Sequence, residues 1–313
     1  MNKYFSFDEI NHDPRSVLTV GTFDGVHLGH QMILDKLKKI ADKDGLRPVL
    51  LTLHPHPQIV LQKPDKPPVQ LLSTIDERML LFEKFGLDNV LVIPFSKEFS
   101  KTSPEEFVVN YLVEKVGVGK ILIGFDHLFG KNREGDFELL SRLSGRFDFE
   151  IEQLGVIEES NEKISSTKIR KAIHEGRLGE ANQMLGYNYF VLGEVIEGEK
   201  RGRTIGFPTA NIESPSRNKL MPAVGVYFVS SEINGKKYWG MANMGVRPTF
   251  KNDAVPNLEV HFFDFIGDIY GERIPIFFHE FIRNERKFSG IDEIVAQLNK
   301  DKEKCLKLKN KFL

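Results

Sequence analysis

The spacing of apolar residues changes once along this 313-residue chain, near Gly186, and that change restricts the folds open to it. Before Gly186, short apolar runs alternate with stretches at helical spacing, a pattern typical of buried parallel strands joined by helices. After Gly186, apolar residues occupy every second position between Gly, Asn and Pro turns, which indicates antiparallel strands. Since a domain averages about 150 residues, we predict two domains, residues 1–186 and 187–313.

The first domain is predicted to be an α/β domain, a doubly wound parallel sheet with helices on both faces, because strand and helix patterns alternate along it. The Pro-rich stretch 63–68 is predicted to be a loop inside this domain. The predicted strands are residues 16–20, 48–53, 89–93 and 120–124. Three helical stripes are predicted between them: Ile33, Leu34, Leu37, Ile40 and Ala41; then, less regular, Met79, Leu80, Phe82 and residues 83–85; and then Phe107, Val108, Tyr111 and Leu112.

The second domain is predicted to be a small closed antiparallel β-barrel, because several short strands follow one another at near-regular spacing. A terminal helix over residues 292–312 is expected on the outside of this barrel. The predicted strands are residues 189–196, 225–233, 237–243, 258–265 and 274–282.

The overall charge is nearly balanced, with 43 Lys and Arg against 44 Asp and Glu, a net charge of −1. Such a chain offers no global field for nucleic acid or an anionic membrane, so we expect neither as a partner. No apolar run approaches the roughly 18 residues of a membrane span. The single cysteine, Cys305, cannot form an internal disulfide, and we expect an exposed thiol in a cytoplasmic protein. A monomer or weak homo-oligomer is expected.

Residues 21–30 follow the first predicted strand directly and open the first helix. The start of a helix presents unpaired N–H groups and the positive end of its dipole, both of which favour an anion. Glycines at 21, 25 and 29 allow sharp turns and close approach of a ligand. His27 and His30 lie three apart on one helical face, where two imidazoles could donate hydrogen bonds to a triphosphate. A metal pair or two structural histidines are the alternatives.

A second helix start, residues 164–170, supports the same chemistry. Ser165, Ser166 and Thr167 place hydroxyls at a capping position, and Lys168 and Arg170 follow them on the helix. Taken alone, this pattern also fits an ordinary helix cap with a basic face.

The barrel half holds a glycine-rich loop that leads into Pro208-Thr209-Ala210-Asn211. Gly202 and Gly206 are expected to free backbone N–H groups for phosphates, while the Thr209 hydroxyl and the Asn211 amide oxygen suit Mg²⁺. A simple connection between barrel strands is the alternative. Further on, period-two alternation places Glu259 on the face opposite Leu258, where it is either a general base or a solvent-facing carboxylate.

These motifs together resemble the bacterial-type FAD synthetases, the family of bifunctional riboflavin kinase/FMN adenylyltransferases, over essentially the whole chain. His27-Leu28-Gly29-His30 and residues 164–170 are similar to the two signatures of the nucleotidylyltransferase superfamily, and residues 202–211 resemble the ATP-binding signature of riboflavin kinase. The resemblance implies a Rossmann-like domain that transfers AMP from ATP to FMN, giving FAD and pyrophosphate. It also implies a barrel that phosphorylates riboflavin with ATP, with Glu259 as base and Mg²⁺ required by both steps.

The resemblance extends to individual residues. It implies catalytic roles for His27, His30 and Glu259, and metal ligation by Thr209 and Asn211. Two residues depart from the family pattern: Thr22 stands where the family often has Asn, and His127 stands where Phe is usual. Expected ATP contacts are Gly21, Thr22, Phe23, Asp24, Gly25, Gly29, Ser165, Ser166, Thr167, Arg170, Gly202, Gly206, Pro208 and Thr209. Expected flavin contacts are His54, Pro55, His56, Pro57, Asp126, Arg283 and Glu285.

Two other functions stay open at this point. A nucleotidylyltransferase fold serves many acceptors, so the chain could carry one activity and use its other domain for flavin binding. A non-catalytic flavin- or RNA-binding protein is the other alternative, and its support is the Lys-rich tail 300–313. Little aromatic interleaving accompanies these lysines, which argues against RNA.

Overall fold

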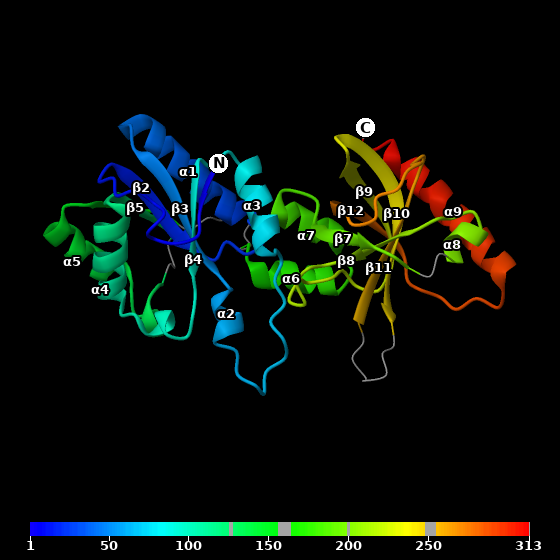
Figure 1. Ribbon diagram of the computed structural model, residues 1–313, viewed down its shortest axis with the longest axis horizontal. Helices are drawn as coiled ribbons and strands as arrows, with labels where there is room; N and C mark the ends of the chain where they lie inside the picture. Colours follow the sequence, from blue (N-terminus) through cyan, green and yellow to red (C-terminus); the bar gives the residue numbers. More distant parts are fainter. Residues whose placement is uncertain (125–127, 156–163, 199–200, 248–254, 313) are drawn as a thin grey trace. The chain divides into compact units, whose positions relative to one another are not determined.

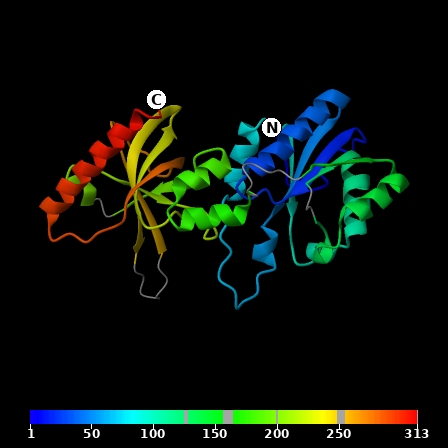
Figure 2. The same cartoon turned by 180° about the vertical axis from the view of Figure 1, so that it is seen from behind.

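The computed structural model describes residues 1–124, 128–155, 164–198, 201–247 and 255–312 (Figures 1 and 2). These residues form two compact units, Met1–Ser165 and Ser166–Leu313. The division between the two units falls before the two helices that precede Gly186. The predicted domain boundary at Gly186 stays a prediction. Asp126 and His127 lie outside the described residues.

The first unit is built on a six-stranded sheet in the order β1-β4-β3-β2-β5-β6, and every neighbouring pair is parallel. This confirms the predicted doubly wound sheet. The edge strands β1 and β6 were not predicted, because each is short and half exposed and so carries no buried apolar run. The strands are β1 (Asn2–Tyr4), β2 (Ser16–Gly21), β3 (Arg47–His54), β4 (Asn89–Pro94), β5 (Val118–Ile123) and β6 (Glu150–Gln153).

Helices connect these strands and cover the sheet. Helix α1 packs against β2 and β3 through the predicted stripe of Leu34, Leu37, Ile40 and Ala41, all of which are buried. The stripe at Phe107 belongs to η2, a π-helix that continues directly from α4. The helices are α1 (Leu28–Asp44), α2 (Pro57–Val60), α3 (Ile75–Lys84), η1 (Phe99–Lys101), α4 (Pro104–Glu106), η2 (Phe107–Val116), η3 (Lys131–Arg133) and α5 (Phe137–Phe147).

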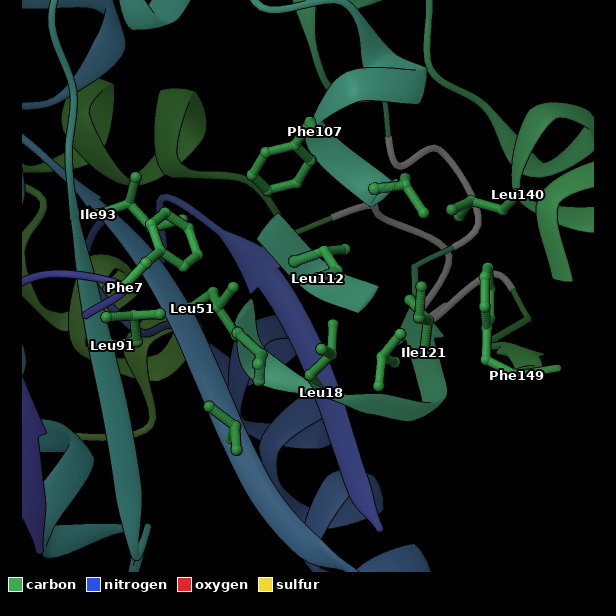
Figure 3. Packing of buried hydrophobic residues seen from close by; sticks show 14 of the residues in the cluster. Phe7, Leu18, Leu51, Leu91, Ile93, Phe107, Leu112, Ile121, Leu140 and Phe149 are labelled. Atoms are coloured by element: carbon green, nitrogen blue, oxygen red, sulfur yellow. The ribbon is translucent and has the colours of Figure 1, made fainter. Parts of the chain in front are cut away.

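One hydrophobic core of this unit joins the sheet to η2 and α5 (Figure 3). Leu18 and Leu51 come from the two central strands, Leu112 comes from η2, and Leu140 comes from α5. All four side chains are at most 2% exposed. Burying a leucine contributes about 1.5–3 kcal/mol, so this core fixes the strands on which the neighbouring loops are built.

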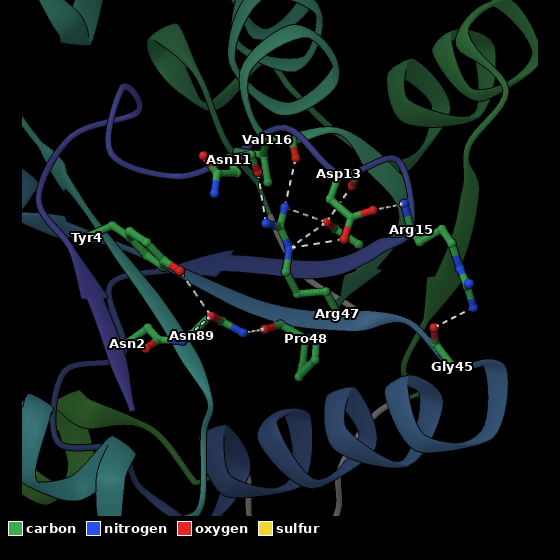
Figure 4. A network of polar contacts seen from close by, with 11 residues as sticks. Asn2, Tyr4, Asn11, Asp13, Arg15, Gly45, Arg47, Pro48, Asn89 and Val116 are labelled. Carbon is green, nitrogen blue, oxygen red and sulfur yellow. Dashed lines mark hydrogen bonds and ion pairs between the residues drawn. The ribbon is translucent and has the colours of Figure 1, made fainter.

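A polar network ties together the amino ends of the strands (Figure 4). The guanidinium of Arg47, at the start of β3, donates to Ser16 Oγ at 2.8 Å, the Asn11 carbonyl at 2.8 Å and the Val116 carbonyl at 3.0 Å. Asn89 of β4 donates to the Pro48 carbonyl at 3.1 Å. This edge of the sheet is thus closed by structural contacts. The opposite edge, where the strands end, carries the predicted site residues.

The second unit contains a closed barrel in the order β10-β11-β8-β7-β12-β9, with every neighbouring pair antiparallel. The predicted barrel is thereby confirmed. The short strand β8 was missed because its residues read as the end of a glycine-rich loop. It pairs with both β7 and β11 and so completes the closure. The strands are β7 (Phe190–Ile196), β8 (Ala210–Glu213), β9 (Gly225–Ile233), β10 (Lys236–Arg247), β11 (Val255–Phe262) and β12 (Arg273–Arg283).

Four helices accompany the barrel among the described residues: α6 (Ser166–His174), α7 (Leu178–Leu185), α8 (Arg201–Thr204) and α9 (Ile291–Lys309). Helix α9 lies along the outside of β10 and β12, as predicted (Figure 1). Its Cys305 is fully buried in a cluster with Phe228 and Trp239, so the expectation of an exposed thiol is wrong. The many lysines of this segment make its single apolar face hard to recognise in the sequence. That face contacts the barrel. No helix in the described ranges is long and apolar enough to cross a membrane.

Candidate active sites

The first candidate site lies where β2 ends and α1 begins. The connecting loop contains two non-glycine residues in the left-handed region, Phe23 at φ 49° and Val26 at φ 35°, as well as Gly25 at φ 79°. A β-branched residue such as valine adopts this conformation rarely and at a cost of about 1–3 kcal/mol. A Cβ on Gly25 would lie 2.7 Å from Leu72 Cδ1. The surrounding structure therefore holds this loop in a strained shape.

Asp24 provides much of that restraint. Its buried carboxylate accepts hydrogen bonds from the Leu72 N–H at 3.1 Å and from the Ser73 N–H at 2.9 Å. Ser73 Oγ accepts in turn from the Gly25 N–H at 2.7 Å. The next residue, Thr74, caps α3 in a reciprocal capping box with Glu77. The loop is thus fastened to the start of α3, and ATP contact by Asp24 stays a prediction.

The structure brings His27 and His30 into contact. His27 is the N-cap residue of α1, and its ring stacks on that of His30 with centroids 3.7 Å apart and 16° between the planes. Desolvation, the neighbouring His27 and the cation of Arg78 lower the pKa of His30 well below 6.5. His30 is therefore neutral at pH 7, with one ring N–H donor and one acceptor. Within the described residues, its buried Nδ1 has no hydrogen-bond partner.

Arg78, on α3, lies beneath this loop and was missed in the sequence. Its side chain is 1% exposed. The guanidinium donates to the Thr22 carbonyl at 2.5 Å and to Thr52 Oγ1 at 2.8 Å. Burial lowers the pKa of Arg78 to about 10. The available signal was its position on the apolar stripe of the helix, three residues before Leu81 and four before Phe82.

The predicted flavin-side residues of this unit follow the neighbouring strand. His54 ends β3, which pairs in parallel with β2, so His54 and the His27 loop lie at the same edge of the sheet. His56 caps α2, because its Nδ1 accepts from the Gln58 N–H at 3.2 Å. Pro55 precedes that cap and Pro57 is the first residue of α2. Partial desolvation first, and the charge of Arg78 second, lower the pKa of His54.

The second predicted signature begins a helix, as expected. Ser166 is the first residue of α6, Thr167 is the next, and Ser165 directly precedes it. Ile169 is fully buried, whereas Arg170 on the same helix is partly exposed. Helix α6 belongs to the second compact unit. Contact of these residues with ATP stays a prediction.

The second candidate site surrounds Glu259 on β11. Asn257 Nδ2 donates to one carboxylate oxygen at 2.7 Å, and Thr209 Oγ1 donates to the other at 3.5 Å. Asn211 on β8 and Asn243 on β10 are the direct cross-strand partners of Glu259. Directly opposed residues share one face of a sheet. The structure therefore brings together three predicted residues, Thr209, Asn211 and Glu259.

The glycine-rich loop before this cluster folds into one short helical turn. A Cβ on Gly202 would lie 2.2 Å from the Phe207 carbonyl oxygen, so only glycine fits there. Gly206 adopts φ 80°, and its N–H donates to the Arg203 carbonyl at 3.4 Å within the turn. The backbone N–H of Gly206, which was expected to be free for a phosphate, is therefore hydrogen-bonded within the turn. Pro208 and Thr209 follow this turn and lead into β8.

His261 supports the same segment and was not assigned a role from the sequence. Its Nδ1 lies 2.8 Å from the Pro208 carbonyl oxygen, and since a carbonyl only accepts, Nδ1 carries the proton. The buried ring also contacts Phe207, with centroids 5.1 Å apart. Burial lowers the pKa of His261, against the opposing effect of this hydrogen bond. His261 thus fixes the backbone immediately before Thr209.

The two predicted flavin contacts near the end of β12 differ in their surroundings. The Arg283 guanidinium binds the buried carboxylate of Asp301 through bonds of 2.7–3.0 Å and so joins β12 to α9. Glu285 Oε1 accepts from Asn243 Nδ2 at 3.1 Å. Since Asn243 faces Glu259 across the strands, Glu285 lies near the second site. Flavin contact by either residue stays a prediction.

A parallel sheet with paired histidines at a helix start, together with a barrel that groups a hydroxyl, an amide and a carboxylate, defines a class of two-domain nucleotide-dependent transferases. Residues 9–168 match the FAD synthetase family model, and residues 185–309 match the riboflavin kinase family model. The chain belongs to the family of bifunctional riboflavin kinase/FMN adenylyltransferases.

Similar proteins cover nearly the whole chain. A bifunctional riboflavin kinase/FMN adenylyltransferase from Listeria monocytogenes serovar 1/2a is 44% identical over 93% of this chain and 91% of its own length. Its counterpart from Bacillus subtilis is 39% identical over 94% of this chain and 92% of its own length. A crystal structure described as a macrolide-efflux protein from Streptococcus pneumoniae is similar with a TM-score of 0.83 and 34% identity, covering 96% of this chain and 97% of that one.

Proposed function

We propose that the chain makes FAD from riboflavin in two ATP-dependent steps. The barrel transfers the terminal phosphoryl group of ATP to riboflavin, giving FMN and ADP. The parallel-sheet domain transfers AMP from a second ATP to FMN, giving FAD and pyrophosphate. The observation that carries the proposal is the presence, in one chain of this family, of two separate clusters suited to phosphate chemistry, one around His27 and one around Glu259.

In the adenylyl transfer, an FMN phosphate oxygen attacks the α-phosphorus of ATP, and the bond to the bridging oxygen of pyrophosphate breaks. Negative charge develops on that oxygen. Ring N–H groups of His27 and His30 are placed at the start of α1, where the helix dipole also favours an anion. We assign them to hydrogen bonding with the phosphates, so that the stacked pair stabilises the leaving group without forming a covalent bond.

In the kinase step, the terminal ribityl hydroxyl of riboflavin attacks the γ-phosphorus of ATP, and ADP leaves. Glu259 is assigned to accept the proton from that hydroxyl. Hydrogen bonds from Asn257 and Thr209 orient its carboxylate. The tie between His261 and Pro208 keeps Thr209 in place. These contacts support a base that is held in position before the substrate binds.

The residues fit a magnesium ion that arrives with ATP. Among the described residues, no three His, Cys, Asp or Glu side chains gather to hold a metal by themselves. Mg²⁺ keeps several waters and shares substrate phosphates, so it needs only one or two protein oxygens. The Thr209 hydroxyl and the Asn211 amide oxygen would supply these oxygens. Bound there, the ion would neutralise charge on the ATP phosphates.

Several finer assignments belong to the same proposal. We assign ATP contacts to residues 21–25, to Gly29 and to the start of α6, and flavin contacts to the residues that follow β3. A cytoplasmic location is inferred because both steps use ATP. The absence of nucleic-acid partners and a monomeric or weakly oligomeric state remain expectations.

The decisive experiment follows flavin products by chromatography over time, starting from riboflavin, ATP and Mg²⁺ with the purified full-length chain. We expect FMN to accumulate first and FAD to follow. A second reaction starts from FMN, which isolates the adenylyl transfer. If the products stop at FMN, or if only the reaction from FMN proceeds, the chain carries one activity and the two-step proposal is wrong.

A further inference from the structure

Arg78 carries a buried positive charge that lacks a nearby counter-ion. No Asp or Glu of the described residues lies within ion-pair distance of its guanidinium, and its buried Nε has no hydrogen-bond partner there. Asp24 acts on it only at longer range. Removing a charge from water costs several kcal/mol unless it is compensated. The hydrogen bonds to Thr22, Thr52 and Leu53 oxygens and the charge of Asp24 offset part of this cost, and negative charge bound nearby would offset more of it.

The hydrogen bonds of Arg78 place this charge at the edge where the site is built. Its partners are the Thr22 carbonyl after β2, the Thr52 hydroxyl on β3 and the Leu53 carbonyl at 3.4 Å. Thr22 begins the strained loop that leads to His27, and Leu53 precedes His54. The guanidinium therefore joins the ends of two strands whose loops carry the predicted ATP and flavin contacts.

Several titratable groups share this environment. The pKa of His30 is lowered by desolvation most, by His27 next and by the charge of Arg78 third. The pKa of His54 is lowered by desolvation most and by the charge of Arg78 second. The charge of Asp24 raises the pKa of Arg78, and that of Asp76 raises the pKa of His54. The two histidines respond to the same cation although they come from different elements. The charge of Arg78 thus acts on two histidines at the edge of the sheet that carries the site.

We propose that Arg78 is a positioning residue for adenylyl transfer: its buried charge complements the phosphates bound at the His27 loop, while its hydrogen bonds fix that loop. The inference rests on the proposed FMN adenylyltransferase activity. Because the side chain is buried, Arg78 acts through the loop and through its field, and it does not touch the substrate. The negative charge that balances it is that of the substrate phosphates.

The test compares two neutral variants, Arg78→Gln and Arg78→Met, with the charged variant Arg78→Lys. Rates of FAD formation from FMN are measured against ATP concentration between pH 5 and 9. Removing the charge is expected to lower kcat/KM for ATP by about tenfold. The cation adds to burial and to His27 in lowering the pKa of His30, so its removal should also shift the acidic ionisation in the pH profile to higher pH. Arg78→Lys keeps the charge but not all of the hydrogen bonds, so it should keep the wild-type pH profile and lose less of kcat/KM than the neutral variants.

Arg146→Gln is the matched control, since Arg146 is exposed, pairs with Glu105 at the surface and otherwise lies only over the ring of its neighbour Phe147. Thermal unfolding identifies which neutral variants fold. If Arg78→Met does not fold, Arg78→Gln serves as the neutral variant, because Gln retains a donor for the Thr22 carbonyl. An unchanged pH profile and an unchanged kcat/KM in a folded neutral variant would overturn the inference. Equal losses in the Lys and neutral variants, with no pH shift, would reduce Arg78 to a structural role and also overturn it. Failure of the proposed function itself is distinct, because the wild type would then make no FAD.

Discussion

His279 is buried on β12, and its neutral form is required by its surroundings. Its Nε2 shares a hydrogen bond of 2.8 Å with Ser230 Oγ, and its ring contacts Trp239 and Phe312, each with centroids 5.0 Å apart. Burial first, and the cation of Lys237 second, lower the pKa of His279 from 6.5 to about 4. The unfolded chain therefore binds a proton at a higher pH than the folded chain. Stability is lost as the pH falls from 6.5 toward 4.

From this group we expect the free energy of unfolding of the second unit to fall by about 3 kcal/mol between pH 7 and pH 4. Unfolding can be followed by the fluorescence of Trp239, the single tryptophan, which lies beside His279. His279→Gln should flatten this pH dependence. His174→Gln, at an exposed histidine of the same unit, should leave it as in the wild type. Equal slopes in both variants would contradict the expectation.

His261 gives a second prediction for a single residue. His261→Phe keeps a ring against Phe207 but removes the hydrogen bond to the Pro208 carbonyl. We expect riboflavin phosphorylation to slow by about tenfold, because His261 would orient Thr209, the proposed metal ligand, and loss of such an orienting group has an effect of this size. FAD formation from FMN, measured in the same preparation, should be unchanged. A variant with normal phosphorylation would show that His261 only fills space.

Two glycines, one at the end of a helix and one inside another, give a prediction at the level of elements. Gly117 ends η2 at φ 80°, and a Cβ there would lie 2.6 Å from backbone atoms of Asp13. Gly145 lies inside α5, and a Cβ there would meet no heavy atom within 4 Å. Gly117→Ala should lower the free energy of unfolding by about 1–3 kcal/mol. Gly145→Ala should raise it by about 0.5–1 kcal/mol. Urea unfolding checks both, and equal effects of the same sign would contradict this.

Elements that bury an apolar face could be predicted from the sequence, and the others could not. Strands β2 to β5 and helix α1 follow from apolar runs, since burial on both faces leaves a clear pattern. Edge strands β1 and β6 bury too little to leave such a pattern. The site shows the same contrast. His27 and His30 are visible through local spacing, whereas the ties of Arg78 and His261 join segments far apart in the sequence and depend on the fold.

The two clusters belong to different compact units, so each activity should be lost separately. His27→Ala is expected to lower FAD formation from FMN by about a hundredfold or more, with riboflavin phosphorylation retained. Glu259→Ala should do the reverse, through loss of a general base worth about a hundredfold or more. Both activities are measured for each variant by chromatography of flavins. A folded variant that loses both activities would refute the proposed division.

The net charge of −1 is consistent with an enzyme that holds anions locally. The negative charge of ATP and FMN would be met by a helix start, by Arg78 and by a magnesium ion, and no broad basic face is needed. The Lys-rich tail fits the same view. It is the exposed side of α9, whose Asp301, Cys305 and Leu308 are buried. Composition alone indicated this balance, and the fold is the basis on which we propose the groups that provide it.

Cys305 makes the docking of α9 measurable. The chain has one cysteine, it is fully buried, and burial raises the pKa of its thiol to about 12. A thiol reagent can therefore modify it only when the helix leaves the barrel or the barrel unfolds. The dependence of the labelling rate on denaturant distinguishes these two openings, because local detachment exposes far less surface than unfolding of the whole unit. The protein thus carries in α9 a natural reporter of helix detachment, with no need for an engineered cysteine.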